Sequence, residues 1–171
     1  MSIDNNGGAL EGHTPRGFAG MGTGLFVGDD VNPGFPEGDG VQAYLTFGLP
    51  GRTVVGRATL SSNSMTLRGE PFRDLGSLLV ERVVYDQFSP ALFDLGAESD
   101  LLTCSRTGDT GISCDVSSFV EEAVGAGADR IQLRLLFEDA GDGDGEPDLA
   151  LFFLTDANTN EAGIFTLTLE D

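Results

Sequence analysis

Strict alternation of apolar and polar or small residues is the feature that most limits the fold of this chain. From Val41 to Leu49 every odd-numbered residue is apolar, and the even-numbered residues are Gln, Tyr, Thr and Gly. A period of two places successive side chains on opposite faces of a β-strand. The same period recurs in residues 54–62, 130–138 and 164–169, whereas residues 149–154 are apolar throughout, as in a strand buried on both faces. These segments therefore predict strands that enclose an apolar core.

Weaker apolar runs bring the expected total to about eight or nine strands; they cover residues 24–27, 65–67 and 78–85. The glycines fall mostly between the apolar runs, where a fold with many turns requires them. With 171 residues the chain can bury one good core, so we expect a single domain over residues 22–171. The pattern predicts an all-β fold, an antiparallel β-sandwich or jelly roll.

Two segments depart from the strand pattern. Residues 115–125 place apolar side chains at helical spacings and predict one short helix, with Ser118 in a capping box and Gly125 as the stop. Ser89–Leu95 is apolar but contains Pro90, which predicts an edge strand or a covering loop.

Residues 1–21 are polar and rich in glycine and show no usable period. We expect a flexible tail or a segment that a partner orders. The tail lacks the apolar run of a signal peptide, so we expect the numbering of a secreted form to begin after processing or at an added methionine.

The charge of the chain is strongly negative. Its 28 acidic residues oppose nine basic residues, all arginines, giving a net charge of −19. Such a surface argues against binding nucleic acid, which needs a basic patch, and against docking on anionic lipid. No apolar run is long enough to cross a bilayer. Divalent cations, a salt-rich medium, or an acidic surface kept for solubility each fit this charge.

The two cysteines, Cys104 and Cys114, bracket the segment Ser-Arg-Thr-Gly-Asp-Thr-Gly-Ile-Ser. A turn at Gly-Asp-Thr-Gly would bring both cysteines together in a hairpin, so we expect a disulfide and an extracellular location. Two buried thiols are the alternative.

Acidic residues are most concentrated in the segment from Asp139 to Asp148, where glycines separate them. Oxygen ligands on a loop that bends sharply suit calcium, which accepts six to eight oxygens in a flexible geometry. The spacing is not that of an EF-hand. We predict calcium ligands at Asp139, Asp142, Asp144 and Asp148, with a solvated acidic loop as the alternative.

Two further loops are candidate calcium sites. The first has oxygen-bearing side chains at alternate positions, Asp156, Asn158 and Asn160, although a turn between strands explains the same residues. The second is a long loop with Asp29 and Asp39 at its ends, whose spacing fits calcium less well.

Catalytic and sugar-stacking residues are scarce. The single histidine, His13, lies in the tail and cannot plausibly complete a nucleophile–histidine triad. Two suitable carboxylates would be enough for a glycosidase, but no cleft motif contains such a pair. Tyr44 and Tyr85 are the only polar aromatic residues, because the chain has no tryptophan. We therefore expect a protein that is not an enzyme.

A resemblance rests on the order of four segments: residues 41–50 (VQAYLTFGLP), 56–60 (GRATL), 114–120 (CDVSSFV) and 131–135 (IQLRL). In this order the chain resembles DNRLRE-type domains over residues 22–170. Those domains are secreted bacterial and archaeal β-sandwiches akin to carbohydrate-binding modules. The resemblance implies a sandwich fold and secretion; the absence of tryptophan departs from it.

The function expected from the sequence is that of a non-catalytic extracellular β-sandwich module, stabilised by calcium, for cell-surface structure, adhesion or assembly. One alternative is a carbohydrate-binding module whose partner is a polysaccharide. Another is a filament subunit in which residues 1–21 add a strand to the sheet of a neighbouring copy.

Overall fold

The computed structural model describes residues 2–4, 10–15, 24–30, 40–49, 51, 55–153 and 165–170. For residues 2–4, 10–15, 24 and 153 it describes the backbone only.

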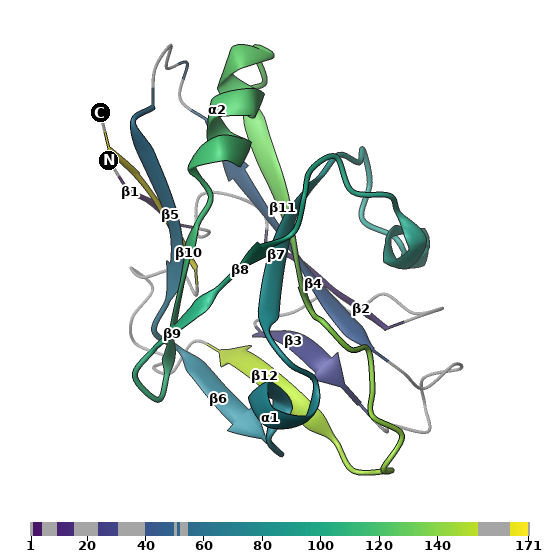
Figure 1. The fold of residues 1–171 in the computed structure, drawn as a ribbon. Coiled ribbons are helices and arrows are strands. Elements are labelled where there is room, and N and C mark those ends of the chain that lie inside the picture. Colours follow the sequence, from purple (N-terminus) through teal and green to yellow (C-terminus); the bar gives the residue numbers. More distant parts are fainter. Residues whose placement is uncertain are drawn as a thin grey trace.

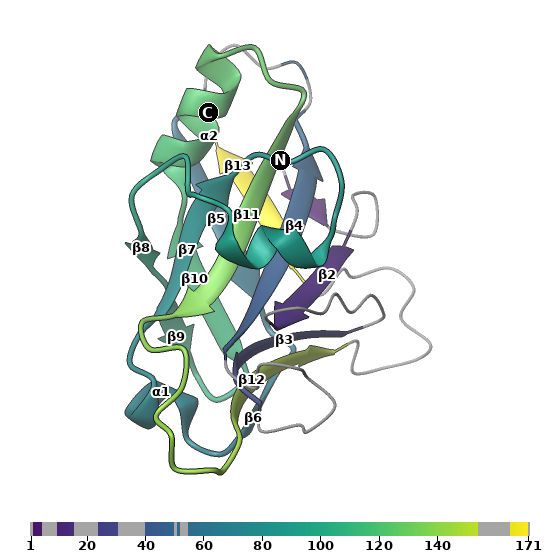
Figure 2. The ribbon, with the colours of Figure 1, turned by 90° about the vertical axis from the view of Figure 1, so that its right-hand side faces the viewer.

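Two antiparallel sheets lie face to face (Figures 1 and 2). The first has five strands in the order β1 (Ser2–Asp4), β13 (Thr166–Glu170), β5 (Arg57–Ser62), β10 (Gly111–Asp115) and β9 (Ser105–Thr107). The second has eight, in the order β6 (Met65–Arg68), β12 (Asp148–Phe153), β3 (Gly24–Asp29), β4 (Val41–Gly48), β11 (Arg130–Phe137), β7 (Leu78–Val83) and β8 (Leu102–Thr103), with β2 (Leu10–Pro15) also paired to β4. The predicted all-β sandwich is confirmed. The strands outnumber the prediction because several are only two or three residues long and carry no readable period.

The alternating residues of β4 and β11 face the interior, as predicted. Ala43, Leu45 and Phe47 on β4 and Leu133 on β11 are fully buried. Leu133 lies directly opposite Leu45, so apolar side chains meet across the strand pair. In the other sheet, Leu60 of β5 lies opposite Cys114 of β10 and Leu167 of β13, and all three are buried. The two inner faces together form one core.

The predicted helix is present as α2 (Ser117–Gly125), at one end of the sandwich (Figure 1). It buries Phe119, Val120 and Ala123 against the core. The helix ends at Gly125, as predicted, but the capping groups differ from those expected: a carboxylate oxygen of Asp115 accepts the Ser117 N–H at 3.1 Å, and the residue with a left-handed backbone is Gly127, whose φ is +73°. The Gly127 N–H donates to Val124 O and the Ala128 N–H to Ala123 O, both at 2.9 Å. These two bonds form a Schellman motif, which needs its glycine two residues later than Gly125.

A covering loop, residues 86–98, lies across the outer face of the eight-stranded sheet (Figure 2). Its centre is the 3₁₀-helix η1 (Pro90–Asp94), so of the two predictions for this segment the covering loop is confirmed. Leu92 packs with Tyr44, Val83 and Tyr85 in a second apolar cluster outside the main core. The Tyr44 hydroxyl donates to Leu92 O at 2.8 Å.

Parts of the predicted tail lie in the sheets. Ser2–Asp4 pairs with β13 and Leu10–Pro15 pairs with β4, so these residues add strands within their own chain. Backbone pairing at a sheet edge needs no apolar period, which is why neither strand is visible in the sequence. The other residues of the tail lie outside the described residues.

The predicted disulfide between Cys104 and Cys114 is confirmed. It connects the residue between β8 and β9 with β10, and it is buried in the main core. Within the described part of the chain, no helix is long and apolar enough to cross a membrane.

Candidate metal centre

The loop between β11 and β12 is shaped by its own acidic side chains. A carboxylate oxygen of Asp142 accepts the Asp144 N–H at 3.0 Å, and a carboxylate oxygen of Asp144 accepts the Glu146 N–H at 2.6 Å. Gly143 and Gly145 separate these residues with φ of +75° and +81°, a conformation that glycine adopts without strain. The alternation of aspartate and glycine therefore produces successive tight turns that hold the carboxylates in place.

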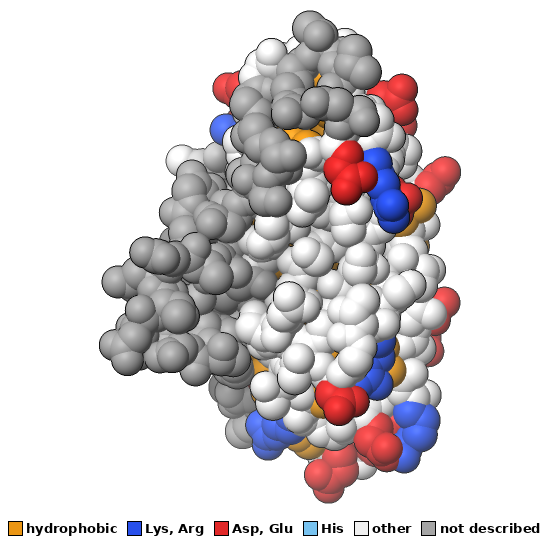
Figure 3. All heavy atoms as spheres, turned by 90° about the vertical axis from the view of Figure 1, so that its left-hand side faces the viewer, with side chains coloured by type: hydrophobic (Ala, Val, Ile, Leu, Met, Phe, Trp, Pro, Cys, Tyr) orange, Lys and Arg blue, Asp and Glu red, His pale blue; other side chains and the backbone are white. Residues whose placement is uncertain are grey.

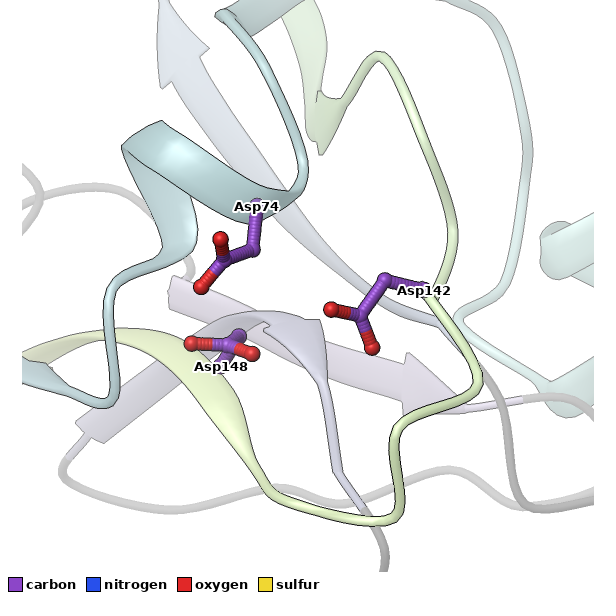
Figure 4. A group of neighbouring side chains, drawn as sticks. All are labelled: Asp74, Asp142 and Asp148. Atoms are coloured by element: carbon purple, nitrogen blue, oxygen red, sulfur yellow. The ribbon is translucent and has the colours of Figure 1, made fainter.

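Three aspartates converge at this loop (Figure 4). Asp142 comes from the loop, Asp148 is the first residue of β12, and Asp74 is the last residue of the one-turn helix α1 (Pro71–Asp74). One carboxylate oxygen from each lies within 4.8 Å of the other two. We call these residues the aspartate triad.

Asp148 is the buried member of the triad, with a residue exposure of only 3%. The Glu70 N–H donates to its Oδ1 at 2.5 Å. Burial raises the pKa of Asp148, and the negative charges of Asp74, Asp142 and Asp144 raise it further, whereas Arg73 lowers it. The surroundings therefore disfavour the charged form of the Asp148 carboxylate, and a bound cation would stabilise that form.

The backbone at Gly69 and Gly141 passes close to two buried carboxylates, those of Asp148 and Asp29. Gly69 has a φ of +70°, and a side chain at this position would clash with Asp148 Oδ1. Asp29, at the end of β3, lies opposite Asp148 in the strand register and is also buried, at 4% exposure. A Cβ at Gly141 would stand 2.7 Å from Asp29 Oδ2, so the loop backbone passes directly over this carboxylate.

Arg73 partly neutralises the triad. Its Nε donates to Asp74 Oδ1 at 2.7 Å, and a terminal nitrogen donates to Asp74 Oδ2 at 2.8 Å. The side chain of Arg73 is 67% exposed, so solvent screens this ion pair and a bound metal could readily compete with it.

The donor set fits a hard divalent cation. All three side chains offer carboxylate oxygen, which calcium and magnesium prefer, and none offers the sulfur or imidazole nitrogen typical of zinc. An open hollow of about 410 Å³ beside Asp74 and Asp148 leaves space for water ligands. Calcium suits a site of mixed side-chain and water oxygens better than magnesium, which demands near-ideal octahedral geometry.

The structure brings together only some of the predicted metal ligands. Asp142 and Asp148 belong to the triad, and Asp29 lies beside it. Asp139 is exposed in the same loop without joining the triad, and Asp144 acts on Asp148 through its charge and shapes the loop. The remaining predicted ligands lie outside the described residues: Asp39, Asp156, Asn158 and Asn160.

Sequence reasoning missed Asp74. This residue is 68 positions before Asp142, in a segment that the sequence suggests is an ordinary loop. A weak signal was present, since Pro71 begins a helical turn whose last residue is the aspartate. Only the packing of α1 against the start of β12 shows that the two segments meet.

Neither the scan against protein-family models nor the search of curated proteins finds a match to this chain. The resemblance to DNRLRE-type domains therefore stays a prediction.

Proposed function

We propose that this protein is a non-catalytic, secreted β-sandwich module that binds calcium at the aspartate triad and serves surface structure, adhesion or assembly. The observation that carries the proposal is the convergence of Asp74, Asp142 and Asp148 from three separate elements, with Asp148 buried and its pKa raised. A charged carboxylate in such a place is costly without a counter-ion.

Calcium would have a structural role in this proposal. Because Asp74 ends α1, Asp142 lies in the β11–β12 loop and Asp148 begins β12, one ion would tie three elements at the same end of the sandwich. The disulfide supports a location outside the reducing cytosol, where free calcium is abundant.

The contacts of the two tyrosines weigh against the carbohydrate-binding alternative. Tyr44 is fully buried and Tyr85 is 7% exposed, both beneath the covering loop. Neither side chain offers an exposed ring face on which a sugar could stack. The filament alternative has no support of its own, since the described strands of the tail pair within the chain.

Differential scanning calorimetry with calcium and with EDTA tests the proposal. Calcium sites of extracellular modules have dissociation constants of roughly 10⁻⁴–10⁻³ M. At ten to a hundred times such a constant, binding to the folded state alone stabilises it by about 1.4–2.7 kcal/mol. For a domain of this size we expect the Tm to rise by about 3–10 °C.

Matched variants locate the site. Asp142→Asn removes a ligand charge at an exposed position, so it should abolish the calcium response and leave the protein folded in EDTA. Asp109→Asn makes the same change in the exposed β9–β10 turn and should keep the full response. An equal Tm in calcium and in EDTA, or an unchanged response in Asp142→Asn, would refute calcium binding at the triad.

A further inference from the structure

Four exposed arginines, Arg57, Arg68, Arg106 and Arg130, form no ion pair with any residue that the structure describes, although the chain has a net charge of −19. Arg73, Arg82 and Arg134 all form ion pairs. What distinguishes Arg68 and Arg106 from Arg57 and Arg130 is that they lie at adjoining hollows lined by acidic side chains.

Arg68 and Arg106 line two adjoining hollows of about 410 Å³ each, which share Gly69, Glu70 and Arg73. We call the two hollows together the mixed-charge groove. Figure 3 shows basic and acidic side chains at the lower end of the molecule, the end at which Figure 1 places β6, β9 and α1, and a second group near the upper end. The middle of the same face, over the five-stranded sheet, carries uncharged side chains.

Arg106 is held in place at one side of the groove. Its guanidinium lies 5.0 Å from the centroid of the Phe72 ring. Phe72 in turn packs edge-on against Phe137 of β11, with the centroids 5.2 Å apart and the rings at 75°. The cation therefore rests on a ring anchored to the core, which reduces the conformational entropy lost on binding.

The other side of the groove presents two exposed carboxylates. Asp144 and Glu146 are exposed there, and neither forms an ion pair among the described residues. The turn in which a carboxylate oxygen of Asp144 accepts the Glu146 N–H fixes the backbone that carries both. As far as the described residues go, the groove thus has the unpaired Arg106 on one side and two unpaired acidic side chains beside the unpaired Arg68 on the other, with the Glu70–Arg73 ion pair common to both hollows.

We propose that the mixed-charge groove is the interface of a weak two-fold symmetric dimer, whose partner is a second copy of this chain. A two-fold axis through the shared residues would place Arg106 of one copy opposite Glu146 of the other, and the reverse contact would form at the same time. Such an isologous interface needs a surface that is complementary to itself. A surface of one charge could not meet this condition in a chain this acidic.

The size of the groove sets the strength of the dimer. A standard stable interface uses roughly 20–30 residues on each side. The two hollows offer about half as many, and their ion pairs are exposed to solvent. We therefore expect a weak dimer, detectable at high protein concentration or when copies are tethered on a surface, where effective concentration favours it.

Sedimentation equilibrium with charge-swapped variants tests the dimer. Arg106→Glu alone should weaken self-association at least tenfold, because it brings acid against acid twice in the symmetric interface. Glu146→Arg alone should do the same by bringing arginine against arginine. An equimolar mixture of the two variants should restore dimers, because both contacts of the mixed dimer then join opposite charges. The glutamate introduced by Arg106→Glu faces the arginine introduced by Glu146→Arg, and the native Arg106 of one copy faces the native Glu146 of the other. Arg130→Glu, with the same charge change at the start of β11, should associate like the wild type.

Each variant is first checked for its Tm and far-ultraviolet circular dichroism; if Arg106→Glu unfolds, Arg106→Asp takes its place, which keeps the charge reversal that the mixture needs. All runs contain EDTA and are repeated with calcium, so the dimer is judged separately from metal binding. A wild type that stays monomeric at millimolar concentration, or a mixture that fails to associate, would overturn the proposal. Binding of polygalacturonate by a monomeric wild type, and its loss in Arg106→Glu, would assign the groove to an acidic polysaccharide instead and would equally refute the dimer.

Discussion

Replacing Arg134 by methionine would remove the cation that holds the covering loop on the eight-stranded sheet. Arg134 of β11 and Glu81 of β7 are cross-strand neighbours, and their side chains are only 7% and 6% exposed. The Arg134 Nε donates to Glu81 Oε1 at 2.5 Å. One of its terminal nitrogens donates to Leu92 O at 3.2 Å and Leu95 O at 2.8 Å, both in the covering loop.

The cost of this substitution follows from the burial of the pair. Arg134→Met leaves Glu81 buried without a counter-charge, which typically costs about 3–5 kcal/mol. This is a large part of the roughly 5–15 kcal/mol by which domains are stable. The double variant Glu81→Met/Arg134→Met removes both charges and should recover most of the loss, because apolar pairs of similar volume replace buried ion pairs well. Arg73→Met is the matched control at an exposed ion pair and should cost less than about 1 kcal/mol.

Two measurements test the loss of stability and the exposure of the covering loop. Urea unfolding gives the free energy, and a slope of about 2 kcal/mol/M predicts a midpoint about 1.5–2.5 M lower for Arg134→Met. Acrylamide quenching of tyrosine fluorescence reports directly on the covering loop, because Tyr44 and Tyr85 are the only tyrosines and the chain has no tryptophan. Quenching should increase in Arg134→Met and remain at the wild-type level in Arg73→Met.

Equal losses of stability in Arg134→Met and Arg73→Met would refute the reasoning, because the buried ion pair would then contribute no more to the free energy of unfolding than the exposed one. Unchanged quenching in a strongly destabilised Arg134→Met would show that the arginine supports the sheet but does not hold the covering loop.

The other predictions concern the triad and the disulfide. Because the pKa of Asp148 is raised in the folded state, the folded protein binds this proton more tightly than the unfolded chain. In EDTA the contribution of Asp148 to stability should therefore fall as the pH rises from the unfolded pKa of about 4 through the higher folded pKa. Tm measurements across this pH range should show the decline in the wild type and not in Asp148→Asn. The same variant should also lose the calcium response. In urea unfolding, Gly69→Ala should lower the free energy of unfolding by more than the roughly 1–2 kcal/mol of a left-handed backbone, because its Cβ would also clash with Asp148. Gly108→Ala, at a φ of +73° with open space around it, should lower it only by the backbone strain. Replacing Cys104 and Cys114 by serine should cost about 2.5–3 kcal/mol, the closure entropy of a loop with a sequence separation of ten, and a reducing agent should destabilise the wild type by the same amount.

The fold class could be read from the sequence because it depends on a local property. Alternation in residues 41–49 and 130–138 fixes which side chains of β4 and β11 face the core, whatever partners the strands have. The short hairpin between the cysteines likewise depends on neighbouring residues, so the disulfide was predictable. Strands β1 and β2 were not, since edge pairing through the backbone leaves no side-chain pattern.

Only part of the candidate metal site could be predicted from the sequence. The aspartates and glycines of residues 139–148 form tight turns with one another, and that local chemistry marks Asp142 and Asp148 as candidates. The third member, Asp74, joins them only because α1 packs against the start of β12.

The sequence by itself determined the alternating faces of the strands, the disulfide-bonded hairpin and the acidic loop, because each depends on interactions between residues close along the chain. The tertiary structure alone decided that Asp74 completes the triad, that a loop covers Tyr44 and Tyr85, and that Arg106 and Glu146 line adjoining hollows. These arrangements depend on which distant elements pack together, and packing is set by the whole core rather than by any one segment.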